Sequence, residues 1–90
     1  MALDTVKMIF SNRYGVSKEE LTEDSLITDL CTDSLEILEL LMYIEDEFDM
    51  TFPDDVAQEF KTLGDIAEYL SRNVDEAVLA ELRKKIEGKA

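Results

Sequence analysis

The sequence predicts an all-α domain of four helices, the third of them short, with a helical extension at the C-terminus. Apolar residues recur at helical spacing in several separate segments of the 90-residue chain. No stretch shows the sustained alternation of apolar and polar residues that is typical of strands. The length suits one domain and lies near the lower end of what a single hydrophobic core supports.

The first predicted helix ends near Tyr14, because Gly15 can take the left-handed conformation that commonly ends a helix. Its apolar face consists of Leu3, Val6, Ile9 and Phe10. Residues 16–32 follow as a long connection whose apolar residues are too irregularly spaced for a strand. We expect these residues to pin the connection onto the core, as a loop of this length requires; they are Val16, Leu21, Leu26, Ile27 and Leu30.

The second predicted helix runs from about Ser34 to Phe48. Asp33 can cap it, and Glu36 three residues later makes a capping-box-like arrangement. Pro53 suits the first position of a short third helix, over roughly residues 54–60. Thr62 is the expected N-cap of the fourth helix, whose inward face consists of Leu63, Ile66, Ala67 and Leu70.

The C-terminal segment differs from the rest of the chain in charge. Residues 1–74 carry 18 acidic and 5 basic side chains, whereas residues 75–90 carry 4 of each. We therefore divide the chain into a domain over residues 1–74 and an amphipathic helical extension over residues 75–90. The apolar stripe of the extension consists of Leu79, Leu82 and Ile86, at helical spacing.

The composition excludes several classes of function. The chain has no histidine and one cysteine, which removes Ser-His, Cys-His and His-metal chemistry. The acidic residues from Asp49 onward fail the calcium-loop pattern, because Thr51, Asp54 and Phe60 occupy its third, sixth and twelfth positions. We expect no metal site and no enzymatic activity.

The net charge of −13 bears on partners and location. A surface of this sign repels nucleic acid, and it favours partners with basic surfaces. No apolar run reaches the roughly 18 residues that a membrane span needs, and the N-terminus lacks the regions of a signal peptide. We expect a soluble, cytoplasmic monomer.

Fifteen acidic side chains and no basic one lie between Lys18 and Lys61: Glu19, Glu20, Glu23, Asp24, Asp29, Asp33, Glu36, Glu39, Glu45, Asp46, Glu47, Asp49, Asp54, Asp55 and Glu59.

On a helical wheel, the second helix has a second, smaller apolar strip beside its core-facing side. The strip consists of Leu35, Leu38 and Met42, and it runs beside acidic side chains. One interpretation is that these are scattered surface apolar residues of the kind that small bundles tolerate. The other is a partner-binding face, in which the apolar strip supplies contact area and acidic residues steer a basic partner; these are Glu36, Glu39, Glu45 and Asp46.

Ser34 also has two interpretations. An Asp-Ser pair at a helix start is most often only a cap. Alternatively, the Ser34 hydroxyl is a modification site, where a phosphate ester would lie at the positive end of the helix dipole. The dipeptide alone does not decide between them.

The chain resembles the acyl carrier protein family over nearly its whole length. The Asp33-Ser34-Leu35 motif is weak alone, but it occurs with other motifs in family order and spacing: Gly15-Val16, Asp29-Leu30, Glu39-Leu40, Glu45-Asp46-Glu47-Phe48, Phe52-Pro53, Thr62-Leu63, Ile66 and Tyr69-Leu70. The resemblance implies a four-helix bundle in which Ser34, flanked by Asp33 and Leu35, takes 4′-phosphopantetheine from coenzyme A. The arm then carries acyl chains as thioesters between enzymes of fatty-acid, lipid or polyketide-type synthesis. The implied partners are a phosphopantetheinyl transferase and acyl-processing enzymes with basic docking patches.

Three departures from the family pattern indicate a specialised member. Cys31-Thr32 stands where the family usually has glycine followed by a small or aliphatic residue, Tyr43 stands where a small residue is common, and residues 75–90 extend beyond the usual end. Two other functions remain open: a non-catalytic interaction subunit with the same fold, and a carrier of aminoacyl or peptidyl groups. The intact Asp33-Ser34-Leu35 motif favours the acyl carrier over a pure adaptor.

Overall fold

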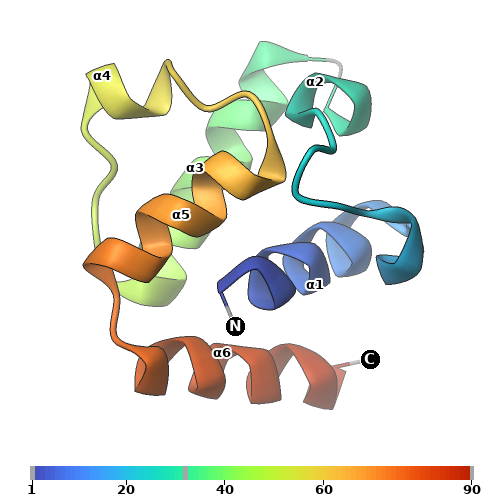
Figure 1. Ribbon diagram of the computed structural model, residues 1–90, viewed down its shortest axis with the longest axis vertical. Coiled ribbons are helices and arrows are strands. Elements are labelled where there is room, and N and C mark those ends of the chain that lie inside the picture. Colours follow the sequence, from blue (N-terminus) through green and yellow to red (C-terminus); the bar gives the residue numbers. More distant parts are fainter. Residues whose placement is uncertain (1, 32, 90) are drawn as a thin grey trace.

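The computed structural model describes residues 2–31 and 33–89, with side chains through residue 85. Thr32 and the predicted apolar contact of Ile86 therefore lie outside the description. Over the described residues the chain is helical, and an isolated antiparallel bridge joins Leu26 to Thr62. The elements, in chain order, are α1 (Ala2–Tyr14), η1 (Lys18–Glu20), α2 (Ile27–Leu30), α3 (Ser34–Phe48), α4 (Asp54–Ala57), α5 (Leu63–Asn73) and α6 (Glu76–Lys89) (Figure 1).

The helices surround one hydrophobic core. Helix α1 packs against α5 and α6, and α3 also contacts α6, so α6 lies along one end of the bundle (Figure 1). The fold class predicted from the sequence, including the helical extension, is confirmed. None of the described helices is long and apolar enough to cross a membrane. The largest fully buried side chains include Phe10, Leu40, Ile44, Leu63, Ile66, Leu70 and Leu79.

The connection between α1 and α3 is more structured than the sequence predicts. It contains η1 and α2, which were expected to be loop. Leu21 and Ile27 are buried as expected, but Leu26 is 44% exposed, so its predicted role as a core anchor is wrong. Leu26 lies at the bridge to Thr62, where alternate side chains of extended backbone point in opposite directions.

Hydrogen bonds to the start of α5 hold this connection in place. Gly64 N–H donates to the Glu23 carbonyl at 2.9 Å, and Leu63 N–H donates to the Ser25 carbonyl at 3.0 Å. A Cβ atom on Gly64 would come within 2.8 Å of the Glu23 oxygen, so this close approach requires glycine. The connection that leads to α3 is therefore attached to α5.

The ends of the longer helices follow their local sequence signals. Gly15 ends α1 with φ of 70°, as predicted. Asp33 caps α3 by accepting a hydrogen bond from Leu35 N–H, so the bond reaches the second helical position rather than the third position of a capping box. Thr62 and Asp65 form the complete capping box at the start of α5.

Helix α4 is shorter than the predicted range of residues 54–60, and it ends at Ala57. Pro53 precedes it as the N-cap instead of being its first residue. Beyond α4, Phe60 packs edge-on against Phe52, with ring centroids 5.3 Å apart, and both rings contact Tyr69 of α5. Phe60 therefore belongs to an aromatic cluster with Phe52 and Tyr69 and is not part of α4.

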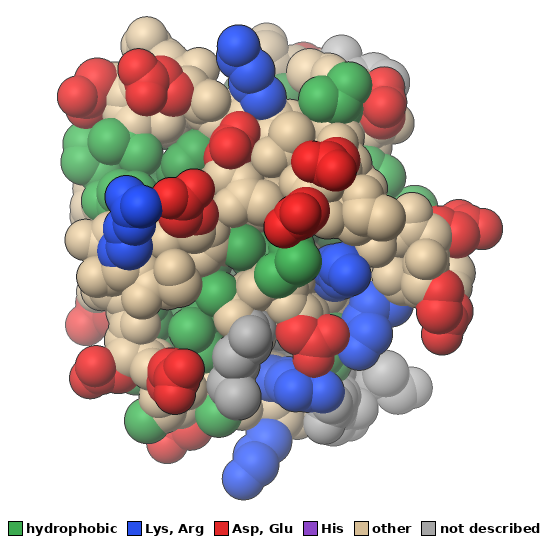
Figure 2. Space-filling model, in the orientation of Figure 1, with side chains coloured by type: hydrophobic (Ala, Val, Ile, Leu, Met, Phe, Trp, Pro, Cys, Tyr) green, Lys and Arg blue, Asp and Glu red, His purple; other side chains and the backbone are tan. Residues whose placement is uncertain are grey.

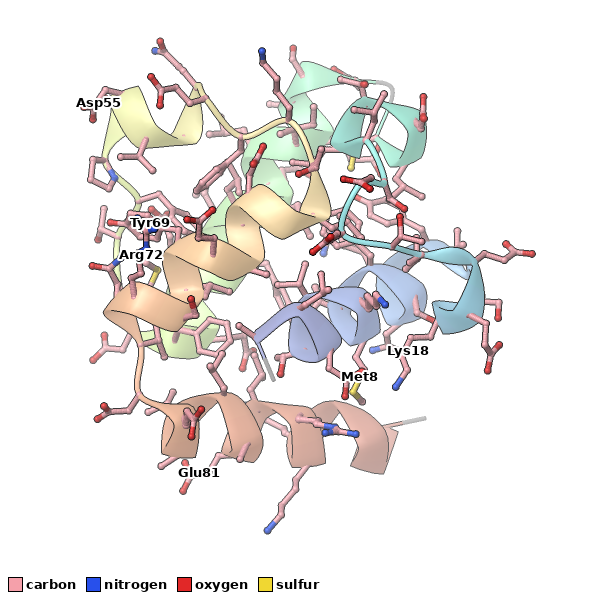
Figure 3. The ribbon with its side chains drawn as sticks, viewed as in Figure 1. Met8, Lys18, Asp55, Tyr69, Arg72 and Glu81 are labelled. Atoms are coloured by element: carbon pink, nitrogen blue, oxygen red, sulfur yellow. The ribbon has the colours of Figure 1, made fainter. Side chains whose placement is uncertain are left out.

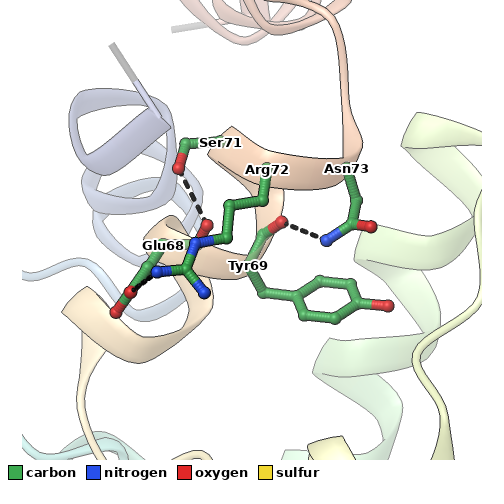
Figure 4. Close-up of polar contacts among 5 residues, drawn as sticks. All are labelled: Glu68, Tyr69, Ser71, Arg72 and Asn73. Atoms are coloured by element: carbon green, nitrogen blue, oxygen red, sulfur yellow. Dashed lines mark hydrogen bonds and ion pairs between the residues drawn. The ribbon is translucent and has the colours of Figure 1, made fainter.

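The C-terminal end of α5 uses its own polar side chains. Arg72 pairs with Glu68 at 2.6 Å, and Asn73 Nδ2 donates to the Tyr69 carbonyl at 2.9 Å (Figure 4). Ser71 donates to the Glu68 carbonyl in the same turn. Tyr69 and Arg72 also line a shallow groove beside α4 (Figure 3). These contacts lie within the last two turns of α5.

Helix α6 is held by apolar contacts and, among its described side chains, by the ion pairs of Arg83 and Lys85. Leu79 and Leu82 are buried, as the stripe in the sequence predicts. Arg83 pairs with Asp4 of α1 at 2.9 Å, and Lys85 pairs with Glu47 of α3 at 3.2 Å. Figure 2 shows basic side chains gathered where α1 and α6 meet, on a face whose other charges are mainly acidic.

Candidate functional site

Ser34 is the first residue of α3, and its side chain is exposed. Asp33, in extended conformation, accepts a hydrogen bond from Leu35 N–H at 3.0 Å through its Oδ1 atom. The cap fixes where the helix begins and leaves the neighbouring hydroxyl at the surface. Because α3 has 15 residues, its first turn lies at the positive end of a full helix dipole.

An apolar strip runs along the exposed side of α3 from the turn that contains Ser34. Leu35, Leu38 and Met42 are 59%, 54% and 53% exposed, which matches the wheel derived from the sequence. The core-facing side is also as predicted, with Leu40, Leu41, Ile44 and Phe48 buried and Ile37 partly buried against them. Three large apolar side chains are thus left at the surface beside Ser34.

The acidic residues predicted for the partner face differ in their surroundings. Glu39 and Asp46 are exposed, and Glu36 and Glu45 are half-buried. Glu45 Oε2 accepts a hydrogen bond from Phe52 N–H at 2.7 Å, so this carboxylate also holds the loop after α3. Asp49 ends α3 in the left-handed conformation, with φ of 51°. Glu39 and Asp46 are therefore the most accessible of the four.

Tyr43 is half-buried and packs against the core. On the helical wheel, Tyr43 falls among the acidic side chains of this helix. The guanidinium of Arg13, on α1, lies over its ring at 5.8 Å from the centroid, a cation–π geometry. Burial raises the pKa of the Tyr43 hydroxyl, and the charge of Glu47 raises it further. Tyr43 thus joins α3 to α1, a role that the sequence did not suggest.

Cys31 lies at the end of α2, three residues before Ser34, and it is buried. Its thiol donates a hydrogen bond to the Tyr14 hydroxyl oxygen at 2.8 Å. Burial raises the pKa of the thiol, which keeps it protonated and unreactive at neutral pH. Sequence reasoning singled out Cys31 as a departure from the family pattern but did not find its partner, which is 17 positions away.

The arrangement suits attachment of a phosphate-linked group. The Ser34 hydroxyl is accessible, and the N-terminus of a long helix favours the negative charge that a phosphodiester would bring. The nearby apolar strip and the exposed acids Glu39 and Asp46 offer contact area and charge to a basic partner. The residues present therefore fit a phosphopantetheine arm.

Comparison with known proteins decides the family. A family model described as a phosphopantetheine attachment site matches residues 4–70. The chain belongs to the acyl carrier protein family. It is 41% identical over 73 residues to an acyl carrier protein of Clostridium perfringens (strain SM101 / Type A), a match that covers 80% of this chain and 96% of the relative.

A second relative is similar over a slightly longer part of the chain. The chain is 38% identical over 77 residues to an acyl carrier protein of Clostridium acetobutylicum, which covers 84% of this chain and the whole of that protein. As a member of the family, the protein is an acyl carrier with covalently attached 4′-phosphopantetheine. Family membership also implies interaction with acyl-processing enzymes.

Proposed function

We propose that Ser34 Oγ is the attachment point of 4′-phosphopantetheine. The observation that supports this most is the exposed Ser34 hydroxyl at the first position of α3, inside the segment that matches the phosphopantetheine attachment family. Asp33 and Leu35 flank this hydroxyl, with Asp33 capping the helix and Leu35 beginning the exposed apolar strip. The same serine is thus both accessible and locally ordered.

The transfer step uses one atom of this side chain. Ser34 Oγ loses its proton and forms a bond to the phosphorus of coenzyme A that bears the pantetheine arm. The phosphoanhydride bond breaks, and adenosine 3′,5′-bisphosphate leaves. The first turn of α3 stabilises the negative charge of the new phosphodiester through the helix dipole. When bound, the arm supplies a terminal thiol that holds acyl chains as thioesters.

The outer face of α3 is the proposed docking surface for the transferase and for acyl-processing enzymes. Leu35, Leu38 and Met42 supply the contact area, because each has more than half of its surface exposed. Acidic residues on α3 attract basic docking patches and orient the partner; they are Glu36, Glu39, Glu45 and Asp46. Partners would therefore approach along α3, toward Ser34.

We also propose a class of pathway, a location and an oligomeric state for this carrier. The carrier shuttles acyl chains between enzymes of fatty-acid, lipid or polyketide-type synthesis and has no catalytic activity of its own. It acts in the cytoplasm as a monomer. The acyl carrier proteins that it resembles support the acyl class of cargo, in preference to aminoacyl groups.

The test is the intact mass of the protein after co-expression with a broad-specificity phosphopantetheinyl transferase. Wild-type protein should gain the mass of one phosphopantetheine group, and Ser34→Ala should gain none while keeping its helical circular dichroism spectrum. Ser17→Ala is the matched control, since Ser17 is also exposed and precedes a helical turn. Modification of Ser34→Ala would show that the attachment site lies elsewhere.

A further inference from the structure

The segment immediately before Ser34 is attached to α1 by a side-chain contact. Cys31 Sγ–H donates to the Tyr14 hydroxyl oxygen, with 2.8 Å between sulfur and oxygen. Only 1% of the Cys31 surface is exposed, and its backbone N–H donates to the Ile27 carbonyl at 2.8 Å. Cys31 is therefore held through both its side chain and its backbone.

Tyr14 is a fixed point for this contact. Its ring packs against Phe10, one turn earlier on α1, with centroids 5.8 Å apart. Helix α1 is in turn held by its contacts with α5 and α6. The hydrogen bond to the Tyr14 hydroxyl therefore holds Cys31 at a defined place relative to α1.

The contact is made three residues before the first residue of α3. Burial is the main cause that raises the pKa of both Tyr14 and Cys31, and the negative charge of Glu36 raises both further. Cys31 is three residues before Ser34, and its partner Tyr14 is the last residue of α1. Both groups are protonated at neutral pH, as a neutral hydrogen bond requires.

We propose that Tyr14 is a positioning residue for the modification of Ser34: its hydroxyl holds Cys31, and Cys31 restricts where α3 presents the Ser34 hydroxyl. This inference rests on the proposed attachment at Ser34. Only two residues separate Cys31 from Ser34 in the chain, so a shift of Cys31 changes where the chain enters α3. Because a misplacement of about 1 Å can slow a positioned reaction by orders of magnitude, this restriction affects the transfer step.

Asp33 and Tyr14 have different roles in this arrangement. The Asp33 carboxylate bonds to Leu35 N–H, which fixes the helix start relative to α3 itself. The Tyr14–Cys31 contact fixes the same region relative to α1. Loss of the first would fray the helix, whereas loss of the second would let an intact α3 present Ser34 less uniformly.

The test is steady-state kinetics of pantetheine transfer, with coenzyme A and a broad-specificity transferase, on four variants of the full chain. Tyr14→Phe and Cys31→Ala should each lower kcat by about two- to tenfold, the rate equivalent of one hydrogen bond. The KM for the carrier should stay at the wild-type value, because the docking face is unchanged. Cys31→Ser should restore kcat, since a serine hydroxyl can donate to Tyr14. Tyr69→Phe is the control, as it also removes the hydroxyl from a partly buried tyrosine.

Three results would overturn the proposal: equal kcat for Tyr14→Phe and Tyr69→Phe, failure of Cys31→Ser to exceed Cys31→Ala, or an effect confined to KM. Circular dichroism at the assay temperature identifies any variant that unfolds. If Tyr14→Phe unfolds, the kcat values of Cys31→Ser and Cys31→Ala alone test the proposal. A wild-type protein that is not modified at Ser34 would instead contradict the proposed function. The two failures are therefore distinguishable.

Discussion

Lys85 of α6 and Glu47 of α3 form an ion pair, with 3.2 Å between Nζ and Oε2. A second pair joins Arg83 to Asp4, so α6 is attached to both α3 and α1. The Lys85 side chain is 59% exposed, and exposed pairs contribute at most about 1 kcal/mol. The ion pairs therefore orient α6, and its buried leucines stabilise it.

We expect Leu79→Ala to lower the free energy of unfolding by about 2–5 kcal/mol, because it leaves a cavity under α6. Leu79 is 1% exposed. Leu38→Ala is the matched control, since Leu38 is 54% exposed, and it should change stability by about 0.5 kcal/mol or less. Urea denaturation followed by circular dichroism measures both. Equal losses of unfolding free energy in the two variants would show that Leu79 of α6 does not pack in the hydrophobic core.

Asp65 should make stability depend on pH in the acidic range. Its Oδ2 atom accepts hydrogen bonds from Lys61 N–H and Thr62 N–H. These bonds, led by that from Lys61, hold the pKa of Asp65 below its usual 3.8. Because the folded state favours the charged form, the stabilisation is present above pH 3.8 and is lost as pH falls through the lowered pKa.

The corresponding measurement compares Asp65→Asn with wild type by urea denaturation between pH 3 and 7. At pH 7 the variant should be less stable by about 0.5–1.5 kcal/mol, and the difference should shrink below pH 4. Asp46→Asn is the control, since Asp46 is exposed in the last turn of α3. A difference for Asp65→Asn that does not change with pH would contradict the role given to its charge.

Reversal of the Glu39 charge should weaken docking more than stability. Glu39→Lys is expected to slow association with the transferase by roughly three- to tenfold at low salt, because it replaces attraction by repulsion. Stopped-flow binding at rising ionic strength is the measurement, and the effect should fade near 1 M salt, where screening acts within about 3 Å. Glu81→Lys makes the same charge change on α6. Similar slowing by both variants would mean that net charge matters and the α3 face does not.

Local signals in the sequence were sufficient to predict α3 and α5. Capping by Asp33 and Thr62 depends on hydrogen bonds within one turn, so the sequence pattern contains it. The exposure of Leu35 and Leu38 follows equally from the helical period. This part of the fold and the place of the Ser34 hydroxyl therefore follow from the order of the residues alone.

Contacts between distant positions were not predictable in the same way. Helical turns η1 and α2 lie in a connection that is held by hydrogen bonds to residues about 40 positions later. The contact of Tyr14 with Cys31 and that of Arg13 with Tyr43 join separate helices. No periodic pattern encodes such pairs, because they depend on how whole helices pack.

The position of α6 also has a practical consequence. Its end lies at the opposite side of the molecule from the first turn of α3 (Figure 1). A carrier tethered to a sensor surface through its C-terminus would thus keep Ser34 and the outer face of α3 directed toward solution. Immobilisation through an amine on α3 is not possible, because that helix contains no lysine. C-terminal tethering is consequently the geometry of choice for measuring how partner enzymes bind.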